Sequence, residues 1–283
     1  MPVEESEFQW EISASIPLFY FPLKEIKRHR DLLFRFVRRD FLASYQQTIL
    51  GPFWVLLQPL LIMLTYVTIF KTVVGISTDN SPSGLFYLIG ILVWNYFSES
   101  FTAISYSYHS YAGIFSKVYF PRILVAISFL LSNLIRVGIQ SVLFVVVFLW
   151  YLLHKHAIHP NLEILLVPLY VLLLSGMSMG LGLIFASLTV KYRDIQNLLY
   201  FLLRILLFVS PVIYPLSIVP AKYQTFFLLN PLTPLIEMTR YAFLGAGYHN
   251  YYYLMYCIFF TILVFSFGLI LFNRRDAQAM DII

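Results

Sequence analysis

Long apolar runs alternate with short polar segments along most of the chain. A helix that crosses a bilayer needs about 20 consecutive, mainly apolar residues. We therefore predict an all-α integral membrane protein with six spans, at residues 53–74, 85–108, 123–153, 162–190, 197–219 and 251–272. The third and fourth runs are longer than a bilayer is thick, which indicates that these helices tilt or extend beyond it.

Residues 24–45, ahead of the first run, have a different pattern. On a helix, their apolar side chains share one side and most of their basic side chains lie on the other. The apolar set is Ile26, Leu33, Phe34, Val37 and Phe41. A helix with a basic polar face is suited to lie in the plane of a membrane surface. We predict an amphipathic interface helix over 24–45, separated from the first span by a break at 49–52.

Composition agrees with a membrane protein. Hydrophobic residues make up 60% of the chain, charged residues 12%, and the mean hydropathy is +0.78, which excludes an ordinary water-soluble domain. The net charge is +5, but the basic residues adjoin apolar runs, which favours a membrane over nucleic acid as their partner. A single cysteine, Cys257, excludes an intrachain disulfide.

Lysine and arginine gather in alternate connecting segments. They lie before the first span, between the second and third, between the fourth and fifth, and after the sixth. The remaining segments carry only Lys71, Lys155, Lys222 and Arg240. Because basic residues concentrate on the cytoplasmic side of a membrane, we predict that both termini are cytoplasmic.

The domain division follows from the same pattern. Residues 1–22 are acidic at their start and lack an apolar core, so we predict a cytoplasmic tail and not a signal peptide. Residues 23–283 form one transmembrane domain, with a second cytoplasmic tail at 273–283. Within the fourth span Gly176 and Gly180, and likewise Ser178 and Gly182, are spaced for close helix packing.

Residues 210–250 are rich in proline, which breaks any continuous helix. Two apolar patches remain, at 226–229 and 241–244. Irregular backbone at membrane depth is tolerated only where it packs on protein or lines a cavity. We predict a re-entrant helical hairpin between the fifth and sixth spans, suited to gate an exit. A simple interfacial loop is the alternative.

Charged residues inside the spans are few and costly. Glu99 is an acidic residue in the middle of a span, and Arg136 or Arg204 is its candidate partner. For Arg136, structural pairing and pathway lining stay equally open. Arg204 lies in an otherwise aromatic stripe with one-turn spacing, which favours contact with an anionic or hydroxylated substrate.

Aromatic residues make up 18% of the chain. Their flat faces stack on sugar rings, although lipid contact and interface anchoring explain most of them. The candidates for lining a substrate pathway are Trp54, Gln58, Tyr66, Phe70, Phe97, Phe101, Tyr200, Arg204 and Phe208.

Enzyme motifs are absent from the sequence. A glycine-rich phosphate loop followed by lysine does not occur, so this chain hydrolyses no nucleotide itself. Motifs of zinc peptidases and of serine hydrolases are missing as well. We predict no catalytic residue, no metal and no cofactor in this chain. A metal at His154, His156 and His159 is a minor alternative, because neither carboxylate nor cysteine supports these histidines.

Four regions of the chain carry a resemblance to a known family. They are SYQQTILGPFWVLLQPL at 44–60, SKVYFPRILV at 116–125, KYRDI at 191–195, and SPVIYP with NPLTPLIEMTR at 210–215 and 230–240. In this order and spacing the chain resembles the membrane subunit of type-2 ABC exporters. The branch that it resembles exports lipid-linked polysaccharides such as O-antigen, capsule or teichoic acid. The resemblance extends over residues 23–275.

The resemblance implies a homodimer that works with two copies of a separate ATPase, which binds ATP and Mg²⁺. It implies entry of the lipid head near Arg35, Arg38, Arg39, Gly51 and Pro52. It implies coupling to the ATPase through residues 111–122, with Ile114, Phe115, Lys117, Tyr119 and Arg122. It implies an exit gate with Pro211, Pro215, Asn230, Pro231, Pro234 and Arg240.

The function that we expect is therefore that of a permease subunit in an ATP-driven exporter. It would move a lipid-linked polysaccharide across the inner membrane while a separate subunit hydrolyses ATP. A drug or lipid exporter of the same fold is the nearer alternative. A membrane-embedded glycosyl- or acyltransferase and a scaffolding membrane protein are more distant alternatives.

Overall fold

The computed structural model describes residues 21–111, 113, 120–154, 158–190, 192 and 194–279, with side chains as far as Arg274. Within these residues the regular structure is helical throughout. The helices of the bundle are α4 (Ser83–Ser105), α7 (Ile123–Leu153), α8 (Val167–Thr189), α9 (Ile195–Val209) and α12 (Tyr251–Ala279). Around them lie α1 (Leu23–Arg28), α2 (Arg30–Ala43), α3 (Trp54–Tyr66), α5 (Ser107–Ser110), α10 (Ala221–Leu228) and α11 (Leu232–Leu244). Short helical turns complete the list: η1 (Gly51–Phe53), η2 (Val67–Val73), η3 (Leu162–Leu166) and η4 (Leu216–Ile218).

Four helical stretches of the described chain are long and apolar enough to cross a membrane: Gly51–Val73, Ile123–Leu153, Leu162–Thr189 and Tyr251–Arg274. They coincide with the first, third, fourth and sixth predicted spans. At the second predicted span, α4 has 23 residues but contains the polar residues Asn95, Ser98 and Glu99. At the fifth, α9 has only 15 residues.

The fifth helix is shorter than the sequence pattern predicts. We expected it to continue to residue 219, but α9 ends at Val209 and the chain then runs irregularly through Pro211 and Pro215. Proline has no backbone N–H and restricts the residue before it, so Ser210 takes an extended conformation. The Tyr214 hydroxyl turns back and donates to the Phe208 carbonyl at 2.6 Å.

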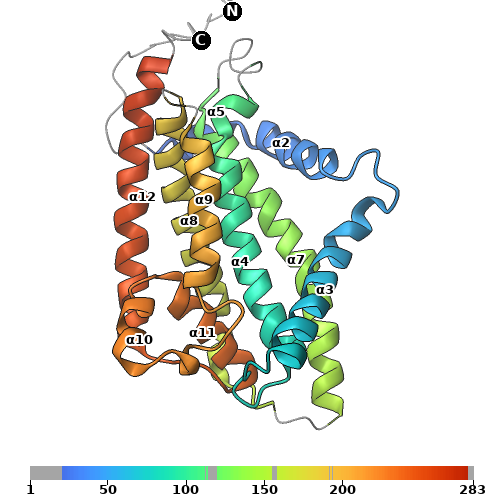
Figure 1. Cartoon of the computed structure of the whole chain (residues 1–283). Helices are drawn as coiled ribbons and strands as arrows, with labels where there is room; N and C mark the ends of the chain where they lie inside the picture. Colours follow the sequence, from blue (N-terminus) through green and yellow to red (C-terminus); the bar gives the residue numbers. More distant parts are fainter. Residues whose placement is uncertain are drawn as a thin grey trace, which may run out of the picture.

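Helix α8 lies at the centre of the bundle, between α12 and α4 (Figure 1). The two predicted pairs of small residues serve two different neighbours. On the α12 side, a methyl group on Gly268 would lie 2.3 Å from the Gly180 carbonyl oxygen. On the α4 side, a methyl group on Gly182 would lie 2.6 Å from Ile104, and Ser178 donates to the Phe97 carbonyl. Both pairs are therefore packing positions, as predicted.

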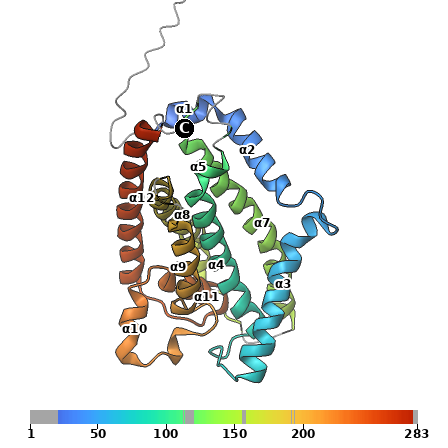
Figure 2. The same cartoon turned by 45° about the horizontal axis from the view of Figure 1, so that its top comes forward.

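Helix α2 lies across one end of the bundle, and α10 and α11 lie at the other end (Figure 1). Figure 2 shows α1 and α2 as two segments that meet at an angle, with α3 standing apart from α9 and α12. The turn between α2 and α3 includes Gly51 with a φ of 51°, a left-handed conformation that glycine adopts at little cost. The predicted break before the first span is thus present.

The buried face of α2 differs from the predicted one. Leu33, Phe36 and Val37 are buried against α7, whereas Phe34 is 66% exposed. Successive residues on a helix are separated by roughly 100° around the axis, so Phe34 points well away from the face that Leu33 and Val37 share. The predicted apolar face of α2 therefore wrongly included Phe34, which is exposed, and omitted Phe36, which is buried.

The close approach of α8 and α12 predicts a steric effect. Gly268→Ala should destabilise the protein by about 1–3 kcal/mol, because the added methyl group meets helix backbone that has no room to move. The measurement is thermal unfolding in detergent. Gly138→Ala is the matched control, since Gly138 in α7 has open space around it and alanine favours a helix. Equal melting temperatures for the two variants would contradict this packing.

Candidate functional site

A cleft of about 580 Å³ that contains charged side chains opens between α2, α4, α7 and α9. Its charged lining residues are Asp40, Glu99, Arg136 and Arg204. Hydroxyl and amide groups come from Ser44, Ser98, Thr102, Ser132 and Asn133, and aromatic faces come from Trp94, Phe129 and Tyr200. Hydroxyl, amide and guanidinium groups beside aromatic rings form a lining that suits a hydroxylated or anionic ligand.

Glu99 and Arg136 form an ion pair in this cleft, from α4 to α7. Both side chains are about one-third exposed or less. Arg136 also donates to the Ser44 hydroxyl at 3.3 Å, and its guanidinium lies 5.8 Å from the centre of the Tyr45 ring. The sequence left two possible partners for Glu99, and the structure selects Arg136. This pairing ties α4, α7 and the end of α2 together.

Arg204 differs from Arg136 in its surroundings. It is exposed on α9, lines the cleft, and makes no ion pair with the residues that the structure describes. Tyr200 and Phe208, one turn away on either side, are 58% and 61% exposed. Leu199 and Leu203 form the buried face of the same helix. The predicted stripe is therefore a continuous exposed face, with its arginine directed to the cleft.

The other predicted pathway residues are distributed differently. Trp54 and Gln58 are exposed on α3. Tyr66 and Phe70 are partly buried and contact each other edge to face, with ring centres 5.5 Å apart. Tyr66 also reaches the Tyr87 ring of α4. The structure thus brings Tyr200 and Arg204 to the cleft and leaves these α3 and η2 side chains outside it.

The structure places Phe97 and Phe101 differently from the prediction. We predicted that they line a pathway, yet each is only about 1% exposed. Both belong to the face of α4 that packs on α8, where Phe101 meets Phe185 edge to face at 5.2 Å. The opposite face of α4, with Ser98, Glu99 and Thr102, is the one that lines the cleft. Residues that are only one or two positions apart on a helix point to different faces, so one can line the cleft while its neighbour lies in the core.

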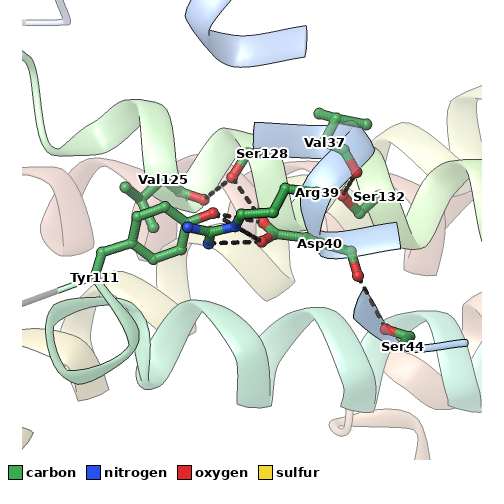
Figure 3. A network of polar contacts seen from close by, with 8 residues as sticks. All are labelled: Val37, Arg39, Asp40, Ser44, Tyr111, Val125, Ser128 and Ser132. Atoms are coloured by element: carbon green, nitrogen blue, oxygen red, sulfur yellow. Dashed lines mark hydrogen bonds and ion pairs between the residues drawn. The ribbon is translucent and has the colours of Figure 1, made fainter. Parts of the chain in front are cut away.

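A second polar cluster joins α2 to the chain beyond α5, and Figure 3 shows its geometry. The Tyr111 hydroxyl donates to the Asp40 carboxylate, with O···O distances of 2.9 and 2.7 Å. Arg39 donates to the same carboxylate at 2.8 and 3.1 Å, and its guanidinium lies 4.1 Å from the centre of the Tyr111 ring. Burial and the neighbouring carboxylate raise the pKa of the Tyr111 hydroxyl, which therefore stays protonated and donates.

Sequence reasoning missed Asp40 and its contact with Tyr111, the residue that begins the predicted coupling segment. One signal was available: Asp40 comes one turn after Phe36, so it places a charge on the buried face of a basic helix. Among the predicted entry residues, Arg39 is committed to Asp40, while Arg35, Arg38 and Pro52 are exposed. Of the predicted coupling residues, Ile114, Phe115, Lys117 and Tyr119 lie outside the described residues. Arg122 is described, with its guanidinium 5.8 Å from the centre of the Tyr108 ring.

The predicted exit-gate residues gather at the opposite end, around a buried arginine. Arg240 is fully buried and bonds to Glu237 at 2.8 Å, to the Pro211 carbonyl at 2.6 Å and to the Val212 carbonyl at 2.8 Å. Its guanidinium also lies 3.6 Å from the centre of the Phe86 ring of α4. These contacts fix α11 to α4 and to the irregular chain after α9.

The remaining exit-gate residues support the same junction. Pro211, Pro215, Pro231 and Pro234 are buried. Asn230 donates to the Ser210 hydroxyl at 2.8 Å and accepts from the Leu232 backbone N–H at 3.2 Å. Of the histidines considered as metal ligands, His156 lies outside the described residues. The described residues contain no cluster of three or more histidine, cysteine or carboxylate side chains that could hold a metal ion.

Comparison with protein families identifies the chain. The profile described as "ABC-2 type transporter" matches residues 31–244, from the start of α2 to the end of α11. The chain belongs to the ABC-2 type transporter family. The cleft, the Asp40 cluster and the Arg240 junction all lie within the matched region of this ABC-2 type transporter.

Curated relatives cover nearly the whole chain. An O-antigen export system permease protein RfbA of Klebsiella pneumoniae is 27% identical over 89% of this chain and 95% of its own length. A protein of the same name from Myxococcus xanthus is 30% identical over 77% of this chain and 82% of its own length. The polysialic acid transport protein KpsM of Escherichia coli is 26% identical over 84% of this chain and 91% of its own length.

The ion pair in the cleft predicts unequal effects of single and double substitutions. Glu99→Leu should destabilise the protein by about 1–3 kcal/mol, because it leaves the Arg136 charge without its partner. The double variant Glu99→Leu with Arg136→Met should recover most of this loss, since it removes both charges. Thermal unfolding in detergent measures both. Additive losses would show that the two side chains act independently.

The Arg240 junction predicts a larger effect. Arg240→Ala should cost about 3–5 kcal/mol, because it leaves Glu237 as a buried charge and two carbonyls without donors. Arg240→Lys should remain strongly destabilised although the charge is kept, since lysine lacks the fork that reaches three acceptors. Unfolding in detergent is again the measurement, and wild-type stability of the lysine variant would contradict the role of the fork.

Proposed function

We propose that this chain is the membrane-spanning permease subunit of an ATP-driven exporter that carries a lipid-linked polysaccharide of O-antigen, capsule or teichoic-acid type. The observation that carries the proposal is the similarity, over most of both chains, to permeases named for O-antigen export and polysialic acid transport. The membership in the ABC-2 type transporter family supports the transport mechanism. The substrate enters from the cytoplasm and leaves across the inner membrane.

The chemistry of the cleft fits such a substrate. Tyr200 and Trp94 offer faces for sugar rings, and serine, threonine and asparagine side chains offer hydrogen bonds to hydroxyl groups. Arg204 offers a cation to a phosphate or an acidic sugar. Several weak contacts suit a polymer that must move, because none of them holds a sugar unit tightly.

The exposed face of α9 supports a homodimer. Tyr200, Phe201, Arg204 and Phe208 present a mixed aromatic and cationic surface that one copy of the chain leaves uncovered. A second copy, facing the first across α9 and α3, encloses this surface as a passage. Two copies of a separate ATPase then bind ATP and Mg²⁺ and drive the passage, so this chain acts as a transporter subunit and not as an enzyme.

In the proposed topology six helical stretches cross the membrane: the four long apolar stretches and, in addition, α4 and α9. The end that carries α2 faces the cytoplasm, because the basic residues of α1 and α2 lie there. Both termini are cytoplasmic, α2 is the interface helix, and α10 with α11 forms the re-entrant hairpin at the exit. Residues 23–283 form one transmembrane domain after an N-terminal tail.

Entry, coupling and exit take place at three parts of this frame. Arg35 and Arg38, exposed on α2 before the turn at Gly51 and Pro52, attract the diphosphate of the lipid head. Residues 111–122 receive the motion of the ATPase. The α10–α11 hairpin gates the exit. The buried hydrogen bonds of Arg240 hold the hairpin against the chain that follows α9.

Arg204 provides the test of this proposal. In the complex of this chain with its ATPase, reconstituted in vesicles, Arg204→Ala should reduce ATP-dependent polysaccharide export about tenfold or more, because a charge-assisted contact is lost. Assembly and stability should stay unchanged, since Arg204 is exposed and unpaired among the described residues. Arg274→Ala, an exposed cation at the end of α12, is the control. Undiminished export by the Arg204 variant would count against a pathway role.

A further inference from the structure

A second cavity, of about 180 Å³, lies between α4, α7, α8 and α11. It is separate from the cleft: on α4 it is lined by Ile89, Val93 and Tyr96, whereas Trp94 lines the cleft. Helix α7 slopes away from α8 toward the end that carries α11 (Figures 1 and 2). Val145 of α7 forms part of the wall and is 47% exposed, so the cavity reaches the outer surface of the bundle. Both α7 and α8 belong to stretches long and apolar enough to cross a membrane, so the opening lies where lipid chains contact the protein.

Polar groups in the lining of this cavity are few, and their protons are already committed. Ser141 and Thr239 each donate to the carbonyl four residues earlier in their own helix, at 2.8 and 2.6 Å. Ser175 donates to a carbonyl of α8, so the Tyr96 hydroxyl that bonds to Ser175 acts as the donor. The fourth hydroxyl, that of Tyr170, donates to a carboxylate at 3.2 Å. The rest of the lining is aliphatic or phenylalanine, so the cavity suits an apolar ligand.

The surroundings of the cavity indicate which apolar ligand enters it. Apolar cavities of roughly 150 Å³ in proteins stay free of water and take up small hydrocarbons. At membrane depth the hydrocarbon that surrounds the protein is the acyl chain of a lipid. A chain that leaves the bilayer core gains packing contacts and little hydrophobic free energy, because both environments are apolar. Selective binding of one lipid therefore needs a further contact outside the cavity.

Glu163 supplies such a contact at one end of the cavity. It lies at the start of the apolar stretch Leu162–Thr189, and the hydrogen bond from Tyr170 links it to the cavity wall. Its carboxylate also accepts from the Tyr251 hydroxyl at 2.6 Å, and the His249 Nε2 atom lies 3.0 Å away. Within the described residues no arginine or lysine forms an ion pair with Glu163, although its side chain is only 14% exposed. A carboxylate this far removed from water favours a cationic partner.

We propose that this cavity and Glu163 form a binding site for a bilayer phospholipid with a primary ammonium head group, phosphatidylethanolamine. One acyl chain fills the space between α7 and α8, and the ammonium group donates to the Glu163 carboxylate. A quaternary ammonium, as in phosphatidylcholine, has no N–H to donate, and the head group of phosphatidylglycerol has no positive charge, so both fit less well. The bound lipid joins α7, α8 and α11 through one molecule. This site goes beyond the proposed function, and neither depends on the other.

The acyl-chain contact is tested with two neighbouring valines of α7. Val145 lines the cavity, whereas Val146, which is 59% exposed, does not. We titrate the full chain in detergent with dioleoylphosphatidylethanolamine and record the melting temperature, which rises as the lipid binds the folded state. In wild type and in Val146→Trp we expect the same rise. In Val145→Trp, whose indole takes the place of the acyl chain, we expect the half-saturating lipid concentration to increase about tenfold or more.

The head-group contact is tested with two lipids that have the same acyl chains. With wild type, dioleoylphosphatidylglycerol should need a half-saturating concentration about tenfold higher than the ethanolamine lipid, because it makes no charge-assisted bond to Glu163. Glu163→Gln keeps the side-chain shape and removes the charge, so it should abolish this preference. Asp31→Asn, at an exposed carboxylate of α2, is the control and should retain the preference.

Three results would overturn the site. The first is equal binding of the ethanolamine lipid by Val145→Trp and Val146→Trp. If Val145→Trp does not fold, Val171→Phe on the α8 wall repeats the comparison, with the exposed Leu172→Phe as its control. The second is a wild type that does not distinguish the two head groups, or a preference that Glu163→Gln retains. The third is stabilisation by a long-chain isoprenoid phosphate, lost in Val145→Trp, without any response to the ethanolamine lipid; this result would assign the cavity to the lipid of an exported substrate.

Discussion

The cost of placing a charge among apolar helices determines how the parts of this chain are joined. Three of the carboxylates that the structure describes lie in largely apolar surroundings and are paired with an arginine: Asp40 with Arg39, Glu99 with Arg136, and Glu237 with Arg240. A buried charge without a partner costs several kcal/mol, so these pairs tolerate little separation. Each is extended by further hydrogen bonds to another segment of the chain. The pairs therefore mark the places where separate segments have to keep one relative position.

The bundle between these junctions is held by shape. In an apolar solvent there is little hydrophobic drive between helices, so close backbone packing takes over. Gly176 and Gly180 bring α12 close to α8, and Gly182 brings α4 close to its other side. These contacts join uncharged groups within the bundle. Small residues therefore build the centre of the bundle, and the charged pairs lie where α2, the wall of the cleft and α11 are attached to it.

Much of this arrangement can be predicted from the sequence, because the signals are local. Apolar runs predict the four helical stretches that are long enough to cross a membrane. The pairs of small residues predict the packing faces of α8, and the prolines after residue 209 predict the short helices α10 and α11. The predictions fail where tertiary contacts determine which side chains are buried and which side chains pair. Nothing in the α4 pattern distinguishes the face of Phe97 and Phe101, which packs on α8, from the face that lines the cleft. The partner of Glu99 and the role of Asp40 depend on residues far along the chain, which no local pattern brings together.

The two arginines of the cleft show why such pairing matters for a carrier. Arg136 is committed to Glu99 and Ser44, so an anion that approaches it has to displace a carboxylate first. Arg204 lies on the exposed face of α9, and within the described residues no carboxylate neutralises it. The Arg204 charge is therefore open to the cleft, while the Arg136 pair keeps the wall of the cleft in place. One arginine is held in an ion pair, and the other remains exposed in the cleft. The difference follows from which helix face each one occupies.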